Sequence, residues 1–307
     1  RKYWYFELLH YFVKLRSLIE QLYHANGNRK VIVLAHSMGN PMANFFYNKI
    51  VDKNWKDTFL LSNWKDTFLL SHISLAGAWG GSAQIVKLFA SGYNMDYFRV
   101  LLPPSRLRAM QYNMDYFRVL LPPSRLRAMQ RSFTSSAFLF PSAALWKSDE
   151  ILATTPRQNY SLSNLDKFFA NYSLSNLDKF FADIQYPQGF DQWKSASEAS
   201  GILSDLPLKV HCIFGVGVDT PDQFQWAHNW FFPDYQPYIR YGDGDGTVYG
   251  DGDGTVNIRS LEVCERWAKE TADGTVEVHR VNGTDHMGIL NDQRTLELIR
   301  DILTKGE

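Results

Sequence analysis

The chain has 307 residues, 32 basic and 32 acidic side chains, and a hydrophobic content of 45%. This balanced charge disfavours a nucleic-acid-binding protein, which needs a basic face. No apolar run approaches the roughly 18 to 20 residues that span a bilayer, so we expect no transmembrane segment.

Apolar residues at helical spacing predict a first helix from about Leu8 to Leu22, with a stop at Asn26-Gly27. Buried strands and further helices alternate after it, which predicts an α/β fold with a mostly parallel sheet. The predicted strands are 31–34, 72–76, 209–215, 237–241 and 276–281. The later predicted helices are 42–51, 255–269 and 295–304.

The connection between the strands at 72–76 and 209–215 is over a hundred residues long, far longer than the others. Such a length predicts an inserted unit. We therefore expect an α/β core formed by residues 1–91 and 206–307. Residues 92–205 would form an inserted helical cap, rich in Phe, Leu and Trp.

The segment Ala35-His36-Ser37-Met38-Gly39 follows a β-branched apolar run. This pattern predicts a nucleophile elbow, the sharp strand-to-helix turn that displays a serine. The small residues at 35 and 39 suit a crowded turn. The alternative is an ordinary strand–turn–helix with a surface serine at position 37.

A nucleophilic serine needs a base and an orienting acid. The motif GDGDGTV occurs twice between residues 241 and 256, and His286 follows a late strand in a Gly-led loop. The chain order Ser, Asp, His is that of an α/β-hydrolase. DGDGT also resembles a calcium loop, but Gly254 stands where an EF-hand loop from Asp243 needs a carboxylate. We therefore expect no metal and no cofactor.

Four segments occur twice in immediate succession, each pair with complete identity. The first copies are Asn54–Ser62, Tyr93–Gln111, Asn159–Ala170 and Tyr241–Val248. Because the pairs differ in length, they give no structural repeat period. We interpret them as duplicated sequence, and we expect one copy of each pair to have no place in the core.

Several motifs together resemble the family of lysosomal phospholipase A2 and lecithin:cholesterol acyltransferase. The segments that carry the resemblance are Lys30–Asn40, SLAGAWGG at 74–81, HCIFGVGVDTPD at 211–222, YGDGDGTVNIRSLEVCERW from 249, and GTDHMGIL at 283–290. The resemblance implies an α/β-hydrolase core with a cap and a membrane-binding domain. It also implies transfer of a fatty acyl chain from a glycerophospholipid to water or a lipid alcohol through an acyl-serine.

The resemblance assigns roles by position. Ser37 would be the nucleophile, His286 the general base, and the Met38 backbone N–H one oxyanion donor. The orienting acid would be the second Asp of the repeated motif, which is Asp253 in the downstream copy and Asp245 in the upstream one. We favour Asp253, because the downstream copy leads directly into the next helix, whereas the upstream copy keeps its register with the strand at 237–241.

Four more residues receive roles. Composition alone leaves Cys212 and Cys264 as two unrelated buried thiols, but the resemblance implies a disulfide between them. It also implies glycosylation at Asn159 and places the protein in the lysosome or the secretory lumen. Trp79 is either a core aromatic or a wall of an acyl groove.

The implied partners are a phospholipid substrate, a membrane surface that the protein contacts peripherally, and a lipid alcohol acceptor. The chain starts just before the elbow strand, so we expect an N-terminally truncated fragment without the family's first strands and second oxyanion donor. Loss of one such donor costs roughly 10²–10³ in rate. The alternative function is a catalytically inactive lipid-binding fragment or pseudoenzyme of the same fold.

Overall fold

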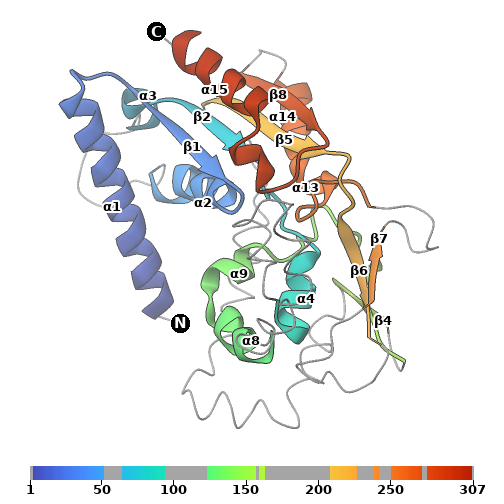
Figure 1. Ribbon diagram of the computed structural model, residues 1–307. Coiled ribbons are helices and arrows are strands. Elements are labelled where there is room, and N and C mark those ends of the chain that lie inside the picture. The colour runs from blue at the N-terminus through green and yellow to red at the C-terminus, as the bar shows by residue number, and fades with distance from the viewer. Residues whose placement is uncertain are drawn as a thin grey trace, which may run out of the picture.

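A four-stranded parallel sheet is the centre of the protein, which we describe from a computed structural model (Figure 1). The strand order is β1-β2-β5-β8, and every pair in this sheet is parallel. The strands are β1 (Val31–His36), β2 (Leu69–Leu75), β5 (Lys209–Val216) and β8 (Val276–Asn282). The predicted parallel sheet and α/β class are confirmed.

The described residues are 3–51, 64–93, 123–156, 159–162, 208–226, 238–241, 250–271 and 275–305. The downstream copies of the duplicated segments contribute residues 64–71, 123–130 and 250–256 to this part of the chain. The third pair contributes residues 159–162 from its upstream copy. Most of the predicted cap lies outside the described residues.

Burial explains the composition of the central strands. All residues of β5 after Lys209 are buried, as expected for a parallel strand covered on both faces. Strand β1 differs because it lies at the end of the strand order, and its Leu34 is 49% exposed. Among the described strands, β1 therefore pairs on one side only.

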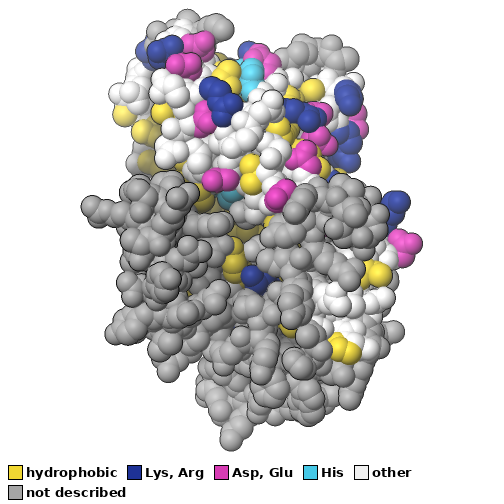
Figure 2. Space-filling model, turned by 45° about the vertical axis from the view of Figure 1, so that its right-hand side comes forward, with side chains coloured by type: hydrophobic (Ala, Val, Ile, Leu, Met, Phe, Trp, Pro, Cys, Tyr) yellow, Lys and Arg dark blue, Asp and Glu magenta, His cyan; other side chains and the backbone are white. Residues whose placement is uncertain are grey.

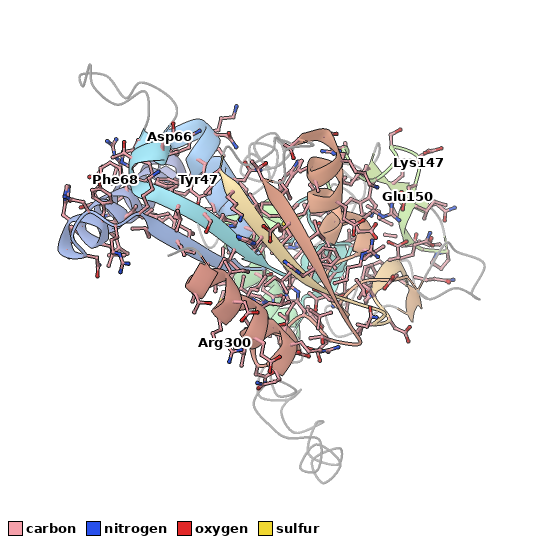
Figure 3. All side chains as sticks on the ribbon, turned by 90° about the horizontal axis from the view of Figure 1, so that it is seen from above. Tyr47, Asp66, Phe68, Lys147, Glu150 and Arg300 are labelled. Carbon is pink, nitrogen blue, oxygen red and sulfur yellow. A yellow bond between two sulfur atoms is a disulfide. The ribbon has the colours of Figure 1, made fainter. Side chains whose placement is uncertain are left out.

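Helices cover both faces of the sheet. Helix α1 (Tyr3–Ala25), helix α2 (Gly39–Phe45), the π-helical turn η1 (Phe46–Ile50) and helix α14 (Val263–Thr271) share one hydrophobic cluster with β2, β5 and β8. Helix α15 (Gln293–Lys305) packs Leu298, Ile299 and Ile302 against Ile213 and Val281 on the other face. Figure 3 shows α14 and α15 on opposite sides of the strands.

Cys212 and Cys264 form a disulfide, which confirms the predicted pairing. Their Cα atoms are 6.4 Å apart and 52 positions separate them in the chain. The bond joins β5 to α14 inside the core, and both residues are almost fully buried. It therefore holds the helix that follows Asp253 against the sheet.

A second sheet, of order β4-β3-β6-β7, lies beside the parallel one (Figure 1). Its strands are β3 (Ile151–Thr154), β4 (Asn159–Ser161), β6 (Pro221–Gln225) and β7 (Tyr238–Tyr241). The strand expected at 237–241 is thus present as β7, but it pairs antiparallel with β6 rather than with the parallel sheet. This sheet combines strands from both sides of residue 206, and the division into core and cap stays a prediction.

The remaining elements are short. They are α3 (Trp64–Phe68), α4 (Gln84–Ser91), α8 (Pro123–Ser132), α9 (Thr134–Phe138), α13 (Ile258–Leu261) and the 3₁₀ turn η3 (Gly288–Leu290). The helix predicted over 255–269 begins later, at Ile258, because the preceding residues form the loop that holds Asp253. None of the described helices has both the length and the hydrophobicity needed to cross a membrane.

Candidate active site

Ser37 occupies the sharp turn between β1 and α2. Its φ of 53° lies in the left-handed region, which a non-glycine residue adopts at a cost in free energy. The backbone N–H of Ser37 donates to the Leu75 carbonyl at 2.9 Å. A Cβ added at Gly39 would lie 3.4 Å from the Ala35 Cβ, so the turn is as crowded as its small residues predicted.

Three side chains from separate loops are joined by two hydrogen bonds. The His286 Nε2 atom lies 2.8 Å from the Ser37 Oγ, and His286 Nδ1 lies 2.7 Å from the Asp253 Oδ2. A carboxylate only accepts, so Nδ1 carries the proton and Nε2 is free to accept the Ser37 hydroxyl proton. This is the arrangement that a serine nucleophile with a general base needs.

The loop around Asp253 fixes the carboxylate. Asp253 is fully buried, and its Oδ1 accepts from the N–H groups of Thr255 and Val256 at 3.1 and 2.8 Å. Gly254 has a φ of 86° and its N–H donates to Thr220, which explains why glycine alternates with Asp here. Oδ2 is left to face His286.

The loop that carries His286 is anchored from three sides. The His286 N–H donates to the Asp253 carbonyl at 2.8 Å. Thr284 donates to Asp292, and the hydrogen bond from Arg294 holds the pKa of the Asp292 carboxyl well below its ordinary value. A Cβ added at Gly215 would lie 1.9 Å from the Thr284 carbonyl oxygen, so only glycine allows β5 to approach this loop.

His36, the residue before the nucleophile, supports the base. Its Nε2 donates to the His286 carbonyl at 2.9 Å, and the two rings lie 4.8 Å apart between centroids. Burial lowers the pKa of His36, outweighing the opposite effect of that hydrogen bond. The neutral imidazole of His36 therefore stabilises the loop that carries His286 through this hydrogen bond.

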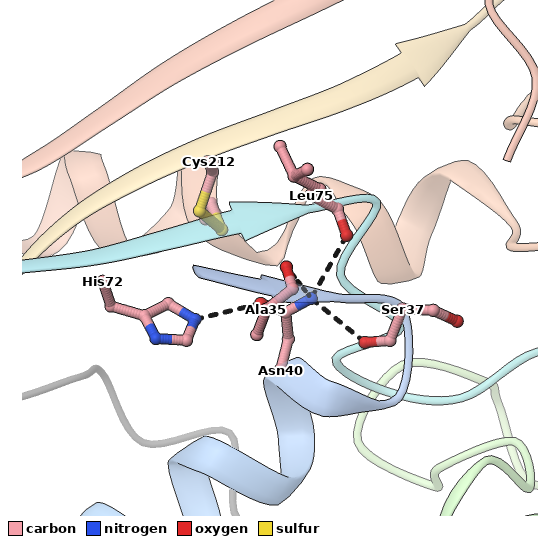
Figure 4. The surroundings of a disulfide bond; sticks show 7 residues. Ala35, Ser37, Asn40, His72, Leu75 and Cys212 are labelled. Carbon is pink, nitrogen blue, oxygen red and sulfur yellow. Dashed lines mark hydrogen bonds between the residues drawn. A yellow bond between two sulfur atoms is a disulfide. The ribbon is translucent and has the colours of Figure 1, made fainter. Parts of the chain in front are cut away.

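A buried amide holds the elbow from within (Figure 4). The Asn40 Nδ2 donates to the backbone oxygens of Ala35, Ser37 and Leu75 at 3.3, 3.0 and 3.2 Å. The Asn40 side chain is fully buried. It thus ties the second-to-last residue of β1, the nucleophile turn and the end of β2 together at one point.

Two more side chains orient this amide. The His72 Nε2 donates to the Asn40 Oδ1 at 3.0 Å, and the His72 Nδ1 lies 3.2 Å from the Tyr47 hydroxyl, which can donate to it. Burial lowers the pKa of His72 to about 3, so the ring is neutral with its proton on Nε2. Sequence reasoning treated His72 only as a buried strand residue and missed the hydrogen-bonded series Tyr47–His72–Asn40. The available signal was a polar residue in an apolar strand, because a buried polar side chain needs a hydrogen-bond partner.

The structure places the other predicted residues as follows. Met38 lies at the N-terminus of α2, with its backbone beside Ser37. Trp79 is 2% exposed and packs edge-on against Trp267 at 4.8 Å, which favours the core interpretation over the acyl groove. Asn159 is exposed at the start of β4. Asp245 lies outside the described residues.

Charged side chains of both signs are interspersed over the described part of the face in Figure 2. This distribution agrees with the balanced composition of the chain. One group of three residues in the described part could hold a metal ion, and it does not include Ser37, Asp253 or His286.

The parallel sheet, its helices on both faces and the turn at Ser37 define an α/β-hydrolase fold. A solved structure with this similarity is the crystal structure of the Tle4–Tli4 complex, which matches with a TM-score of 0.57 and 14% identity. The match covers 91% of this chain and 61% of that chain. At this identity the likeness establishes the fold alone.

The chain belongs to the lecithin:cholesterol acyltransferase family, whose sequence model matches residues 5–293. It is 29% identical to the human lysosomal phospholipase A and acyltransferase over 297 residues, which cover 95% of this chain and 58% of that protein. It is 30% identical to the rat phosphatidylcholine-sterol acyltransferase, covering 95% of this chain and 54% of that protein. The chain thus spans little more than half the length of these relatives, and the predicted resemblance is confirmed.

Proposed function

We propose that this chain carries the acyl-transfer centre of a phospholipase and O-acyltransferase. The reaction would move a fatty acyl chain from a glycerophospholipid to water or a lipid alcohol. The observation that carries the proposal is the hydrogen-bonded series Ser37–His286–Asp253, with distances of 2.8 and 2.7 Å. The names of the relatives supply the substrate class.

The geometry supports a two-step mechanism. His286 Nε2 accepts the proton of the Ser37 hydroxyl as its oxygen attacks the ester carbonyl, and Asp253 stabilises the imidazolium that forms. The Met38 N–H at the positive end of α2 stabilises the developing oxyanion. His286 then protonates the leaving lysophospholipid. In the second step it deprotonates water or a lipid alcohol, which attacks the acyl-Ser37 ester.

The compartment belongs to the same proposal. A core disulfide requires an oxidising environment for its formation, and Asn159, the candidate glycosylation site, is exposed. We therefore place the protein in the lysosome or the secretory lumen. There it would act on a membrane surface from outside the bilayer.

Labelling with a fluorophosphonate probe tests the mechanism directly. We expect the probe to label Ser37, and Ser37→Ala to abolish both labelling and phospholipid deacylation while the circular dichroism spectrum is unchanged. Deacylation that persists in Ser37→Ala would refute the mechanism. Lipid binding by the wild-type chain without any labelling would instead support the inactive lipid-binding alternative.

Matched aspartate variants test the choice of acid. Asp253→Asn should slow labelling by orders of magnitude, because it leaves His286 in the wrong tautomer. Asp251 lies in the same loop, is exposed and accepts from the Gly217 N–H at 2.8 Å, so Asp251→Asn is the control for loop disturbance. Asp245→Asn should leave the labelling rate unchanged. Loss of labelling in Asp245→Asn but not in Asp253→Asn would assign the acid to the upstream copy.

A further inference from the structure

A second cluster of chemically active side chains lies on the parallel sheet, away from Ser37. It comprises His211 on β5 with Glu277 and His279 on β8, and their candidate ligand atoms all lie within 4.8 Å of one another. No step of the proposed acyl transfer uses these residues.

The sheet register explains why they meet. His211 and Glu277 are direct neighbours across the β5–β8 pair, and His279 is paired with Ile213, two residues further along. Side chains two residues apart in a strand share a face, so all three project to the face that α15 covers. The register is fixed by the parallel sheet, which makes the juxtaposition a property of the fold.

The cluster lies in the first half of β5 and β8, whereas His286 follows the end of β8 and Asp253 pairs with Val218, just beyond the end of β5. The neighbouring Arg280 points to the other face of the sheet, where it binds Glu262 and Glu265 at 2.6 Å. It does not neutralise the cluster. The cation that approaches is Lys209, whose Nζ lies 3.1 Å from the Glu277 Oε1.

Two ring nitrogens in the cluster are buried without a hydrogen-bond partner in the described part of the chain. They are the His211 Nδ1 and the His279 Nε2. His211 is only 5% exposed, and its Nδ1 faces the Glu277 Oε2 at 3.2 Å without hydrogen-bond alignment. Leaving a buried polar atom without a hydrogen-bond partner lowers stability, so both nitrogens would gain from a ligand.

We propose that His211, Glu277 and His279 form a binding site for a divalent transition-metal cation of the zinc class. Two imidazoles and one carboxylate are a typical ligand set for Zn²⁺, with a water molecule in the fourth position. Bond lengths of about 2.0–2.2 Å require these ligand atoms to close up by about 1 Å. Glu277 and His279 are only partly buried, so their side chains can make that adjustment.

The protonation states suit a metal. Burial holds the pKa of His211 below its ordinary value, against the opposing effect of Glu277, so the ring offers a lone pair. Partial burial raises the pKa of Glu277, but the hydrogen bond from Lys209 brings it below its ordinary value. Glu277 is therefore ionised, with Oε1 on Lys209 and Oε2 directed at the cluster.

Zinc titration of the full chain tests the site. The protein is prepared without a polyhistidine tag, stripped with EDTA and titrated with Zn²⁺ by calorimetry, with the bound metal counted by mass spectrometry. We expect one tightly bound zinc and a melting temperature that rises with zinc concentration. His279→Ala and Glu277→Gln should each weaken binding by at least about 100-fold, beyond what loss of an outer-shell partner costs.

Three controls make the result decisive. His10 is exposed on α1, so His10→Ala should bind zinc like the wild type. His286→Ala should keep the tight zinc, which separates this cluster from metal capture by His286 and Asp253. The EDTA-treated Glu277→Gln variant should keep the wild-type circular dichroism spectrum. Failure of the wild type to bind zinc, or undiminished binding in both His279→Ala and Glu277→Gln, would overturn the proposal.

Discussion

Replacing Asn40 by leucine removes the buried amide that holds the nucleophile turn and keeps the number and branching of the side-chain heavy atoms. The Asn40 Nδ2 contacts three backbone oxygens, and its Oδ1 accepts the His72 Nε2–H. Two of those oxygens keep another partner, because the Asn40 N–H donates to Ser37 and the Ser37 N–H donates to Leu75. The side-chain group that loses its hydrogen-bond partner is the Nε2–H of His72, which is fully buried.

The expected loss of stability follows from these contacts. An unpartnered buried N–H costs about 1–3 kcal/mol, and each lost hydrogen bond that leaves no orphan costs about 1 kcal/mol. The Asn40 amide has two N–H hydrogens for its three acceptors, so we count two lost hydrogen bonds that leave no orphan. We therefore expect Asn40→Leu to lower the free energy of unfolding by about 4 kcal/mol. Because Ser37 has a left-handed φ that its surroundings must enforce, we also expect fluorophosphonate labelling to slow by about 100-fold.

Urea unfolding and labelling rates measure the two effects. Asn48→Leu is the matched control, since in the described part of the chain the Asn48 amide bonds to Asn44 alone, one turn earlier. The free energy of unfolding of this variant should fall by less than about 1 kcal/mol. Asn40→Leu combined with His72→Leu removes both partners and leaves no orphan N–H. The double variant should be about 2 kcal/mol more stable than the sum of the single effects predicts. Strict additivity of the two substitutions would refute the reasoning.

Three further predictions concern the surroundings of the site. Replacing Cys212 and Cys264 by alanine should lower the unfolding free energy by about 4 kcal/mol in urea, because the disulfide closes a loop of 52 positions. His36→Phe should slow probe labelling by about tenfold, since it removes the hydrogen bond to the His286 carbonyl. The free energy of unfolding should fall as the pH drops from 6.5 toward 3, because unfolding lets His72 bind a proton that the fold excludes. In His72→Gln the decrease in the free energy of unfolding between pH 6.5 and 3 should be smaller by a few kcal/mol, as measured by urea titrations at several pH values.

Much of the parallel sheet could be predicted from sequence, because most of its strands are short, mainly apolar runs. Such a run can be recognised from its own residues, without knowledge of its partners. Strand β7 shows the limit of this reasoning. Residues 237–241 look like another strand, but the partner is chosen by contacts with β6 that lie far from any local pattern. The late start of helix α13 has a similar cause, since the loop before it is held by Asp253 rather than by helix propensity.

The site also contains residues that the sequence predicts and residues that it does not. Ser37 and His286 lie in motifs whose small neighbours can be recognised in the sequence, and the structure brings them together with Asp253. The supporting chain of Asn40, His72 and Tyr47 could not be predicted, because its three members meet only after the elbow, β2 and the π-helical turn have packed. Tyr47 reaches His72 from that single π turn, a local geometry with no reliable sequence signal.

Among the described strands, β1 lies at the end of the parallel sheet, close to the nucleophile turn. The outer N–H and C=O groups of an edge strand can template another strand. A segment that paired there in parallel would end at the same edge of the sheet as His36, so the backbone after it would arrive next to Ser37.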